Sequence, residues 1–384
     1  MILGLSILFG LYACCMMALV LGLRKHPSFS TEVTKPATSF TIVIPFRNEA
    51  ENLPSLLKSI YSLNYPLGLF QIIFVNDDSD DPSEEIIHNA IGKNKVFIQL
   101  IQNKRLSNSP KKDAITEAIK HSKSDWIVTT DADCELPKNW LKTMDAFIQV
   151  ELQRRKENSP MMICGPVRYK SDNSFLQNFQ QMDGFSLQAV TIASFGLKNP
   201  ILSNGANLAY RKDAFDTVNG FTGNNHIASG DDIFLMEKMK KTFPNGVKFL
   251  KSSDAIVLTK PQLSWRDVIN QRIRWASKTS KQKNIISIFL GILVFLTNLS
   301  FLIIPLAIVA DFQNVQFYTF LFLLKTSTDF IVIRHSAKFF GAKISLWKFP
   351  GLSFAYAALI VVVFFGSLGG KYSWKGRTFQ NRDN

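Results

Sequence analysis

Two aspartates separated by one residue, Asp131 and Asp133, end the apolar run that begins at Ile127. The run is typical of a buried strand, which does not need two carboxylates at its carboxyl end. If the segment is extended, both side chains lie on one face. Their oxygens then suit Mg²⁺ or Mn²⁺, hard cations that hold phosphate groups. The alternative is a strand ending in an Asx turn, where aspartate is common.

The elements before this pair alternate between apolar strands and segments with helical periodicity. This alternation predicts an α/β fold with a parallel sheet, whose ligands bind outside the carboxyl ends of the strands. Polar residues follow the first two strands, among them Glu49 and Asp77. The expected strands are Phe40–Pro45, Gln71–Val75, Val96–Ile101 and Trp126–Thr130, and the expected helices are Glu51–Leu63, Pro82–Ile91 and Pro110–His121.

Two further polar motifs follow later in the chain. In Ser203–Arg211, Gly205 allows close backbone approach and Asn207 offers a polar contact. Ser229–Asp232 opens a helix, where an aspartate is an ordinary cap. The elements expected around these motifs are helices at Pro137–Lys156, Phe175–Phe195 and Ile233–Lys241, and a single strand at Met161–Tyr169.

The composition indicates a soluble domain joined to membrane segments. The chain has 384 residues, 46% of them hydrophobic, and a formal net charge of +14. A basic chain fits nucleic acid or the cytoplasmic face of a membrane, and the apolar segments favour the membrane. Uncharged or nearly uncharged runs at 1–23, 285–310, 315–333 and 349–370 are each long enough to span a bilayer. The first is too long for the apolar core of a signal peptide and has no basic residues before it, so a retained helix is expected.

The predicted spans leave a conflict about topology. Lys325 and Asp329 lie four residues apart in the third span, a spacing that allows them to pair inside a helix bundle. Four spans with the intervening domain inside place both termini outside. The basic tail, with Lys371, Lys375 and Arg377, argues for an inside carboxyl terminus. One of the last two segments would then be re-entrant or interfacial.

With the motifs in order, the chain resembles a membrane-anchored family 2 glycosyltransferase. This group includes ceramide glucosyltransferases and chitin, hyaluronan and cellulose synthases. The resemblance runs from about residue 40 to residue 275 and implies a GT-A fold, a Rossmann-like mixed sheet, with flanking transmembrane helices. The motifs are IPFRNE (44–49), VNDDSDD (75–81), KKDAITEAI (111–119), TTDAD (129–133), SGDD (229–232) and QRIRW (271–275).

The resemblance implies an organisation of the chain. A linker at 24–39 would follow the first helix, and a cytoplasmic GT-A catalytic domain would occupy 40–262. An amphipathic interfacial helix would lie within 263–283, in a segment that is basic and contains tryptophan. Residues 284–384 would form the membrane region and the basic tail.

The resemblance also assigns residues to the nucleotide-sugar donor. Asp133 would bind Mg²⁺ or Mn²⁺, and Asp131 would hold ribose or a metal-bound water. Asp77, with Glu49 beside it, would bind the uridine end. Lys111 or Lys112 would contact the nucleotide, and Lys112 is taken as that residue. From the QRIRW motif, Arg272 and Arg274 would neutralise the diphosphate, since guanidinium groups donate paired hydrogen bonds to phosphate.

On the acceptor side, Asp232 stands where the family has its catalytic base. Asp231 replaces the more usual glutamate of that motif and is expected near the acceptor. Asn207, Gln271 and Trp275 would line the acceptor pocket, because sugars and lipid headgroups pack on aromatic faces. Trp275 also suits an interfacial anchor.

The resulting function is inverting transfer of a sugar from a nucleotide diphosphate, taken as a UDP-sugar, to a membrane lipid. The WKGR tail at 374–377 and the small number of spans favour a lipid acceptor. The Q-x-x-R-W motif favours the alternative, a short-chain or processive polysaccharide synthase. A minor alternative is a non-enzymatic scaffold with a degenerate domain. The expected location is a bacterial-type inner membrane with a cytoplasmic catalytic domain, and the donor is the only nucleotide partner expected.

Overall fold

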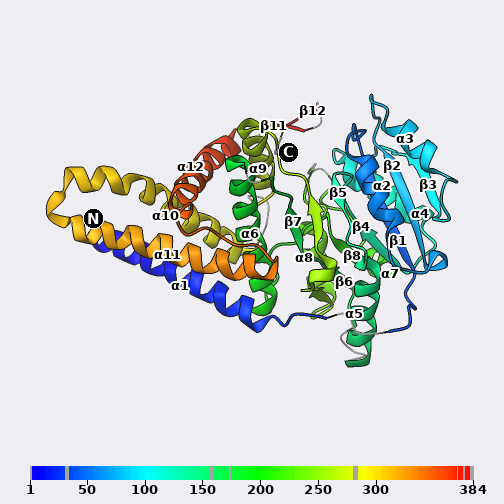
Figure 1. Ribbon diagram of the computed structural model, residues 1–384, viewed down its shortest axis with the longest axis horizontal. Helices are drawn as coiled ribbons and strands as arrows, with labels where there is room; N and C mark the ends of the chain where they lie inside the picture. Colours follow the sequence, from blue (N-terminus) through cyan, green and yellow to red (C-terminus); the bar gives the residue numbers. More distant parts are fainter. Residues whose placement is uncertain are drawn as a thin grey trace. The chain divides into compact units, whose positions relative to one another are not determined.

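The computed structural model describes residues 2–30, 34–154, 159–172, 174–225, 227, 229–279, 284–369, 371–374 and 377–380. The chain folds into two compact units, whose elements are labelled in Figure 1. The sheet unit comprises Pro27–Lys170 and Leu202–Lys260. The helical unit comprises Met1–His26, Ser171–Ile201 and Pro261–Asn384.

Among the described residues, seven strands form the main sheet of the sheet unit, in the order β3-β2-β1-β4-β8-β6-β9. The first four strands in this order are parallel, and β8 is antiparallel to both β4 and β6. The α/β prediction is confirmed, with a mixed sheet. Ile42, Val43 and Ile44 are fully buried, as expected for a central strand covered on both faces. The strands are β1 (Phe40–Phe46), β2 (Phe70–Asn76), β3 (Ile98–Gln102), β4 (Trp126–Thr129), β6 (Met162–Cys164), β8 (Leu208–Arg211) and β9 (Val247–Phe249).

A second sheet within the described chain has the order β5-β10-β7. Its strands are β5 (Cys134–Glu135), β7 (Val167–Tyr169) and β10 (Val257–Thr259). The single strand predicted at Met161–Tyr169 is wrong, because the chain divides there into β6 and β7, which belong to different sheets. Gly165 and Pro166 lie at the break. Proline has no N–H to continue a strand ladder, and a Cβ on Gly165 would overlap the Asn207 side chain.

Helices complete the sheet unit. In α2, Leu53, Leu56, Leu57 and Ile60 are buried at helical spacing, so one face packs on the core. Helix α4 has the predicted bounds, with Pro110 in its first turn where no N–H is needed. Residues 155 and 156 of the predicted helix 137–156 lie outside the described residues. The helices are α2 (Leu53–Tyr61), η1 (Leu67–Leu69), α3 (Ser83–Ala90), α4 (Pro110–His121), α5 (Trp140–Arg154), α7 (Lys212–Thr217), α8 (Ile233–Thr242) and η3 (Ser253–Ala255).

The helical unit contains the apolar helices and also α6, which was expected in the catalytic domain. Helix α6 packs against α1 and α11, and glycines Gly22 and Gly196 allow the backbones of α1 and α6 to touch. The catalytic domain expected over 40–262 is therefore interrupted, because Ser171–Ile201 belongs to the helical unit. The helices are α1 (Ile2–Lys25), α6 (Phe175–Gly196), α9 (Trp265–Thr279), α10 (Ile285–Ala310), η4 (Phe312–Asn314), α11 (Val315–Phe339) and α12 (Phe349–Leu368).

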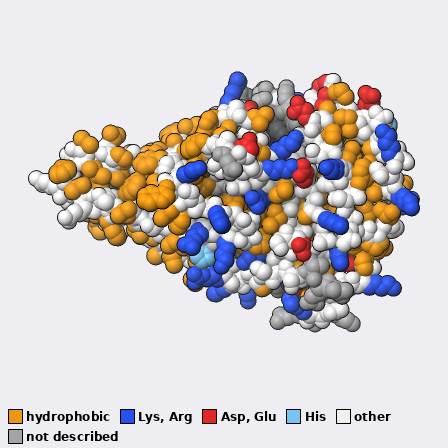
Figure 2. All heavy atoms as spheres, viewed as in Figure 1, with side chains coloured by type: hydrophobic (Ala, Val, Ile, Leu, Met, Phe, Trp, Pro, Cys, Tyr) orange, Lys and Arg blue, Asp and Glu red, His pale blue; other side chains and the backbone are white. Residues whose placement is uncertain are grey.

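Three helices in the described part of the chain, α1, α10 and α12, are long and apolar enough to cross a membrane. Figure 2 shows hydrophobic side chains over the visible face of α1, α10 and α11. Helix α11 also carries Lys325 and Asp329, whose charged atoms lie 2.9 Å apart, so the predicted pairing is confirmed. The Tyr12 hydroxyl donates to the same carboxylate at 2.6 Å, which ties α1 to α11.

The tail forms a hairpin of β11 (Lys371–Trp374) and β12 (Arg377–Gln380). Lys375 of the predicted basic tail lies outside the described residues, as do 31–33 of the predicted linker and 280–283 of the predicted interfacial segment.

Candidate active site

The two aspartates Asp131 and Asp133 lie in a tight turn between β4 and β5. The Cys134 N–H donates to the Asp131 carbonyl at 3.1 Å, which closes a β-turn. The prediction that this pair is extended, with both side chains on one strand face, is wrong, because the chain reverses between them. The turn follows β4 at its carboxyl end, the edge at which the parallel strands β1 and β2 also end. Both carboxylates are therefore at the predicted ligand-binding edge.

Lys111 joins two of the predicted acidic motifs. Its Nζ lies 2.7 Å from Asp131 Oδ1 and 3.1 Å from Asp231 Oδ2. The three side chains come from α4, the β4–β5 turn and the segment before α8. Burial alone would lower the pKa of Lys111, but Asp131, Asp231 and Asp232 raise it above its ordinary value. The lysine therefore remains a cation at neutral pH.

Gly205 lies against this cluster, as its motif suggested. A Cβ at this position would lie 2.7 Å from Asp231 Oδ2 and 3.2 Å from Lys111 Nζ. The Gly205 carbonyl accepts a hydrogen bond from Thr129 Oγ1 at 2.9 Å, which fixes the loop before β8 to β4. Glycine therefore leaves the ends of the Asp231 and Lys111 side chains where they are, whereas a Cβ would push them aside.

Asp232 is buried at the start of α8. Its Oδ1 accepts from the Ile233 N–H at 2.8 Å, and its Oδ2 accepts from the Gly205 N–H at 3.3 Å. The side chain therefore caps the helix, which is the ordinary reading of its position. Its assignment as the catalytic base stays a prediction. Asp231 is the neighbour that contacts the lysine.

Lys112, the residue chosen for the nucleotide, does not join this cluster. Its Nζ donates to the Asn224 carbonyl at 2.7 Å and to the Ile227 carbonyl at 2.9 Å, and the residue is 1% exposed. Consecutive helical residues are about 100° apart, so Lys111 and Lys112 face different surroundings. Lys111 is thus the lysine beside the DxD turn, and the nucleotide contact expected of Lys112 stays a prediction.

Asn207, expected in the acceptor pocket, is fully buried and bonded within the fold. Its Oδ1 accepts from Trp140 Nε1 at 3.0 Å. Its Nδ2 donates to the carbonyls of Pro166 and Ala255, each at 2.8 Å. The amide thus joins α5, η3 and the break between β6 and β7. These bonds use both ends of the amide, and the acceptor contact expected of Asn207 stays a prediction.

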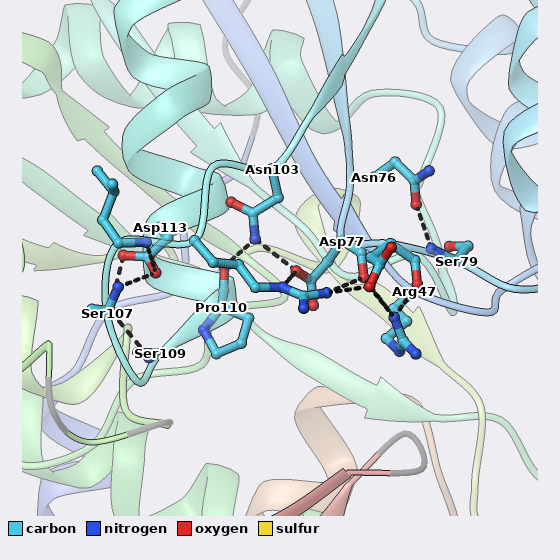
Figure 3. Close-up of polar contacts among 12 residues, drawn as sticks. Arg47, Asn76, Asp77, Ser79, Asn103, Ser107, Ser109, Pro110 and Asp113 are labelled. Atoms are coloured by element: carbon cyan, nitrogen blue, oxygen red, sulfur yellow. Dashed lines mark hydrogen bonds and ion pairs between the residues drawn. The ribbon is translucent and has the colours of Figure 1, made fainter.

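Asp77 begins the second polar cluster of the sheet unit, and Figure 3 shows it facing Asn103. Its Oδ1 accepts from Asn103 Nδ2 at 2.8 Å and from Arg105 Nε at 2.7 Å. Burial would lower the pKa of Arg105, but Asp77 and Asp78 raise it. Among the described residues, the buried Asn103 Oδ1 and the nearby buried Ser109 Oγ have no hydrogen-bond partner. These two atoms are suited to polar groups of a ligand.

The loop next to Asp77 is held by Arg47. Its guanidinium donates to the Asp77 carbonyl at 2.9 Å and to Asp80 Oδ2 at 2.9 Å. Asn48 and Asp78 adopt left-handed backbone conformations, with φ of 52° and 63°. Glu49 is buried nearby, and its carboxylate accepts from the Asn52 side-chain amide. Arg47, Asn103 and Arg105 were not predicted as site residues; only the position of Arg47 inside the IPFRNE motif could have indicated one of them.

The QRIRW residues lie on α9 in the helical unit. Arg272 Nε donates to Asp183 Oδ2 at 2.6 Å, and both residues are more than nine-tenths buried. The guanidinium of Arg272 is thus engaged by a carboxylate of α6, and the diphosphate role expected for this arginine stays a prediction. Arg274, Gln271 and Trp275 are half-buried on the same helix.

The described residues contain no group of three or more His, Cys, Asp or Glu side chains arranged around one metal position. The pair Asp131 and Asp133 still fits a Mg²⁺ or Mn²⁺ ion, since such ions often use one or two carboxylates and take the remaining ligands from water and substrate phosphates.

Comparison with known proteins identifies the domain. The family Glycosyl transferase family 2 matches residues 41–218. Undecaprenyl-phosphate 4-deoxy-4-formamido-L-arabinose transferases of Salmonella paratyphi B and Salmonella newport are each 26% identical over 186 residues, which is 48% of this chain. The chain spans about half the length, 52%, of these curated relatives.

The fold is also found in a solved structure. A mannosyltransferase from Pyrobaculum calidifontis, in complex with GDP-Man and Mn²⁺, superposes with a TM-score of 0.58. The sequence identity is 14%, and the superposition covers 96% of this chain and 99% of the mannosyltransferase chain. At this identity the likeness shows the fold, which agrees with the mixed α/β sheet described above. Residues 41–218 therefore match the family Glycosyl transferase family 2, and apolar helices lie before and after this segment in the sequence.

Proposed function

We propose that the protein is an inverting glycosyltransferase that transfers a sugar from a nucleotide diphosphate to a membrane lipid. The observation that carries this proposal is the contact of Lys111 with both Asp131 and Asp231, since it joins the DxD turn to the second acidic motif. The family match and the lipid-phosphate acceptor in the relatives' names support the same reaction. The apolar helices are suited to cross a membrane, which is where such a lipid acceptor lies.

The donor's nucleoside would bind at the Asp77 cluster. Asn103 Oδ1 and Ser109 Oγ are buried atoms that a ligand would satisfy, and Arg47 and Arg105 are donors beside them. A uracil edge alternates acceptors and a donor, and this mixed set is complementary to it. UDP is the donor nucleotide we propose, and the resemblance also places Glu49 here.

The donor's diphosphate would lie at the DxD turn. Asp133 and Asp131 would hold Mg²⁺ or Mn²⁺, which when bound neutralises charge that develops on the leaving diphosphate. Lys111 adds a fixed cation at the same corner, and Arg274 is the remaining arginine of the QRIRW motif for this role. Preorganised positive charge of this kind stabilises the transition state more than the ground state.

The acceptor's hydroxyl or phosphate oxygen would attack the anomeric carbon in one displacement. The nucleoside diphosphate would leave as the new bond forms. Where the acceptor is a hydroxyl, Asp232 would take its proton as general base, and the bonds of Asp232 to two backbone N–H groups fix its orientation. The capping role and the catalytic role are compatible, because a carboxylate oxygen has two lone pairs. Asp231 would keep Lys111 in place from the same segment.

We place the protein in a bacterial-type inner membrane with the sheet unit in the cytoplasm. Basic residues Arg24 and Lys25 end α1 directly before the sheet unit begins, as the positive-inside rule requires of a cytoplasmic flank.

The test is transfer by the purified full chain in lipid nanodiscs. Radiolabelled UDP-sugars would be supplied with undecaprenyl phosphate, diacylglycerol or ceramide, with Mn²⁺ or with EDTA. Label should enter the organic phase with one sugar per lipid and only with metal. A ladder of polymer products would instead establish the synthase alternative that the Q-x-x-R-W motif favours.

A matched pair of variants tests the base. Asp232→Asn should lower turnover by ~10²-fold or more while UDP binding by calorimetry stays within twofold. Asp213→Asn, at an aspartate of α7 paired with Arg211, should leave both unchanged. Turnover of Asp232→Asn equal to the wild-type rate would remove Asp232 from the mechanism.

A further inference from the structure

A buried ion pair in the helical unit connects α6 to the QRIRW motif on α9. Arg272 Nε donates to Asp183 Oδ2 at 2.6 Å, and Arg272 Nη2 contacts the same oxygen. Asp183 is 4% exposed and Arg272 is 7% exposed. Removing two charges from water is costly, and an apolar pair of similar volume is often as stable. The presence of this buried pair is therefore better explained by the side chains that it orients than by a gain in the stability of the fold.

The same guanidinium orients two neighbours on α9. Arg272 Nη1 donates to Gln271 Oε1 at 2.6 Å. The Arg272 Cζ atom lies 4.2 Å from the centroid of the Trp275 ring, within cation–π distance. Arginine has donors only, so this bond requires the oxygen of the Gln271 amide to face Arg272. The rotamers of both neighbours thus depend on where Arg272 is held.

Asp183 is the residue that holds it. The side chain of Arg272 has several rotatable bonds, and a carboxylate that binds Nε and Nη2 restricts them. Helix α6 also packs closely on α1 through Gly22 and Gly196, so Asp183 is presented from an element that is itself fixed. The constraint therefore runs from α6 through Asp183 and Arg272 to Gln271 and Trp275.

We infer that Asp183 is a positioning residue for the acceptor: through Arg272 it sets the orientation of Gln271 and Trp275, the side chains that receive the lipid headgroup. This inference rests on the proposed function, because it takes Gln271 and Trp275 as acceptor-binding residues of that reaction, the role that the family resemblance implies for them. In this inference Arg272 acts indirectly, on the acceptor side, instead of contacting the diphosphate as the resemblance implied. Loss of Asp183 should therefore weaken acceptor use and spare donor binding.

The kinetic test compares Asp183→Asn with Asp267→Asn in the full chain in nanodiscs. Asp267 is an exposed aspartate of α9 that binds Ser264, so its change controls for loss of an acid near the motif. Asp183→Asn should raise the KM for the lipid acceptor on the order of tenfold, with kcat and the Kd for UDP within twofold, since small misplacements of binding groups have effects of this size. Asp267→Asn should change none of these values.

A charge exchange separates positioning from a folding defect. Asp183→Arg combined with Arg272→Asp restores a buried pair with reversed polarity but places no guanidinium beside Gln271 and Trp275. This double variant should recover the thermal midpoint lost in Asp183→Arg alone and keep the raised acceptor KM. Recovery of a normal KM by the exchange would overturn the inference, as would a raised Kd for UDP in Asp183→Asn.

A spectroscopic readout keeps the inference testable apart from activity. The emission of Trp275 is obtained by subtracting the spectrum of Trp275→Phe, in the wild-type and Asp183→Asn backgrounds. The two difference spectra should differ, because the guanidinium leaves the ring face when Asp183 is lost. Identical difference spectra would contradict the positioning role. If the wild type transfers no sugar to any lipid but these spectra differ, the proposed function fails while the orienting contact stands.

Discussion

At the scale of single residues, the corner around the DxD turn is defined by one lysine. Lys111 contacts Asp131 and Asp231 and remains charged, so it neutralises the carboxylates when no metal is bound. Under the proposed function, a divalent cation at Asp131 and Asp133 would share the Asp131 carboxylate with the ammonium group. The lysine would then weaken metal binding in the absence of nucleotide and offer a cation to the diphosphate once nucleotide is bound.

Lys111→Met should tighten Mn²⁺ binding without nucleotide by roughly tenfold. A unit charge within about 4 Å is worth at least ~1 kcal/mol even in water-like surroundings, and its repulsion of Mn²⁺ is lost. The same change should weaken UDP binding by a similar factor. Calorimetric titrations of Mn²⁺ and UDP into the full chain measure both effects.

Lys112→Met is the matched control for this prediction. Its buried ammonium group binds two backbone carbonyls away from the acids, so its loss should lower the thermal midpoint and leave the Mn²⁺ affinity unchanged. A change of Mn²⁺ affinity in Lys112→Met, with none in Lys111→Met, would reverse the two roles assigned here.

The sequence identified the acidic residues of the site better than their partners. Asp77, Asp131, Asp231 and Asp232 lie at one edge of the sheet unit or on loops beside it, because each follows or precedes an element whose type the sequence indicates. The bonds of Asn207 and Lys112 to backbone groups of distant segments could not be predicted from their motifs. Those partners, Pro166 and Ala255 for Asn207, become neighbours only in the folded chain.

At the scale of elements, the strands and helices were predicted well where the apolar periodicity was long. Helices α4 and α10 have the predicted bounds, and β1 differs by one residue. The errors lie where backbone geometry overrides composition. Met161–Tyr169 is apolar enough for one strand, but Gly165 and Pro166 divide it between two sheets. The assignment of α6 to the helical unit also had no local signal, since its glycines match α1 only in three dimensions.

The carboxyl end of α4, the helix that presents Lys111, is supported by a charge network around Glu117. Lys120 Nζ donates to Glu117 Oε2 at 2.7 Å, and Lys104 Nζ lies 3.0 Å from Oε1. Hydrogen bonds from Lys120 and then Lys104 lower the pKa of Glu117 from 4.5 to about 2. A carboxylate with a lowered folded pKa stabilises the protein above its unfolded pKa. This contribution is therefore full above about pH 4.5 and is lost as the pH falls through about 2.

Glu117→Gln should lower the thermal midpoint at pH 7 by a few degrees, since ~1 kcal/mol shifts a domain of this size by about 2–4 °C. The difference from wild type should shrink as the pH is lowered from 4.5 toward 2, because the wild-type carboxylate becomes protonated there. Thermal unfolding scans of the full chain at a series of pH values measure this difference in midpoint. Glu85→Gln, at an exposed glutamate of α3, is the control, and a pH-independent difference for Glu117→Gln would exclude the linkage.

At the scale of the whole molecule, the directions of the helices in the helical unit bear on the conflict between four predicted spans and a basic tail on the inside. Arg24 near the end of α1 contacts His335 near the end of α11 at 3.2 Å, so these two helices end on the same side. Helix α10 leads through η4 into α11, and the two form an antiparallel hairpin. The amino end of α10 therefore also lies on that side, which we call the basic side because it carries Arg24 and Lys25.

Helix α12 ends on the basic side but begins inside the helix bundle. Nine residues separate it from α11. Phe354 in its second turn contacts Phe301 of α10 and Phe322 of α11. Gly366 near its carboxyl end instead lies against Ile273 of α9. In Figure 1 it lies near α9 and does not follow α10 and α11 to their far ends. Its length and composition suit a span, but its packing against α9 is that of a re-entrant or interfacial helix. With α1 and α10 as spans, and α11 as a third that crosses by its packing against them rather than by its own composition, the basic tail lies on the basic side.

We therefore predict that the carboxyl terminus and Lys343 face the cytoplasm while Gln313, in η4, faces the opposite side. The physical reason is that Lys and Arg are retained on the cytoplasmic side, and the segment 310–314 contains neither. In a variant without the four native cysteines, Gln313→Cys should react with a membrane-impermeant maleimide in intact cells, and Lys343→Cys only after lysis. Green fluorescent protein fused to the carboxyl terminus should fluoresce, because it matures in the cytoplasm. Labelling of Gln313→Cys in intact cells together with a dark fusion would restore a fourth span at α12 and place the tail outside.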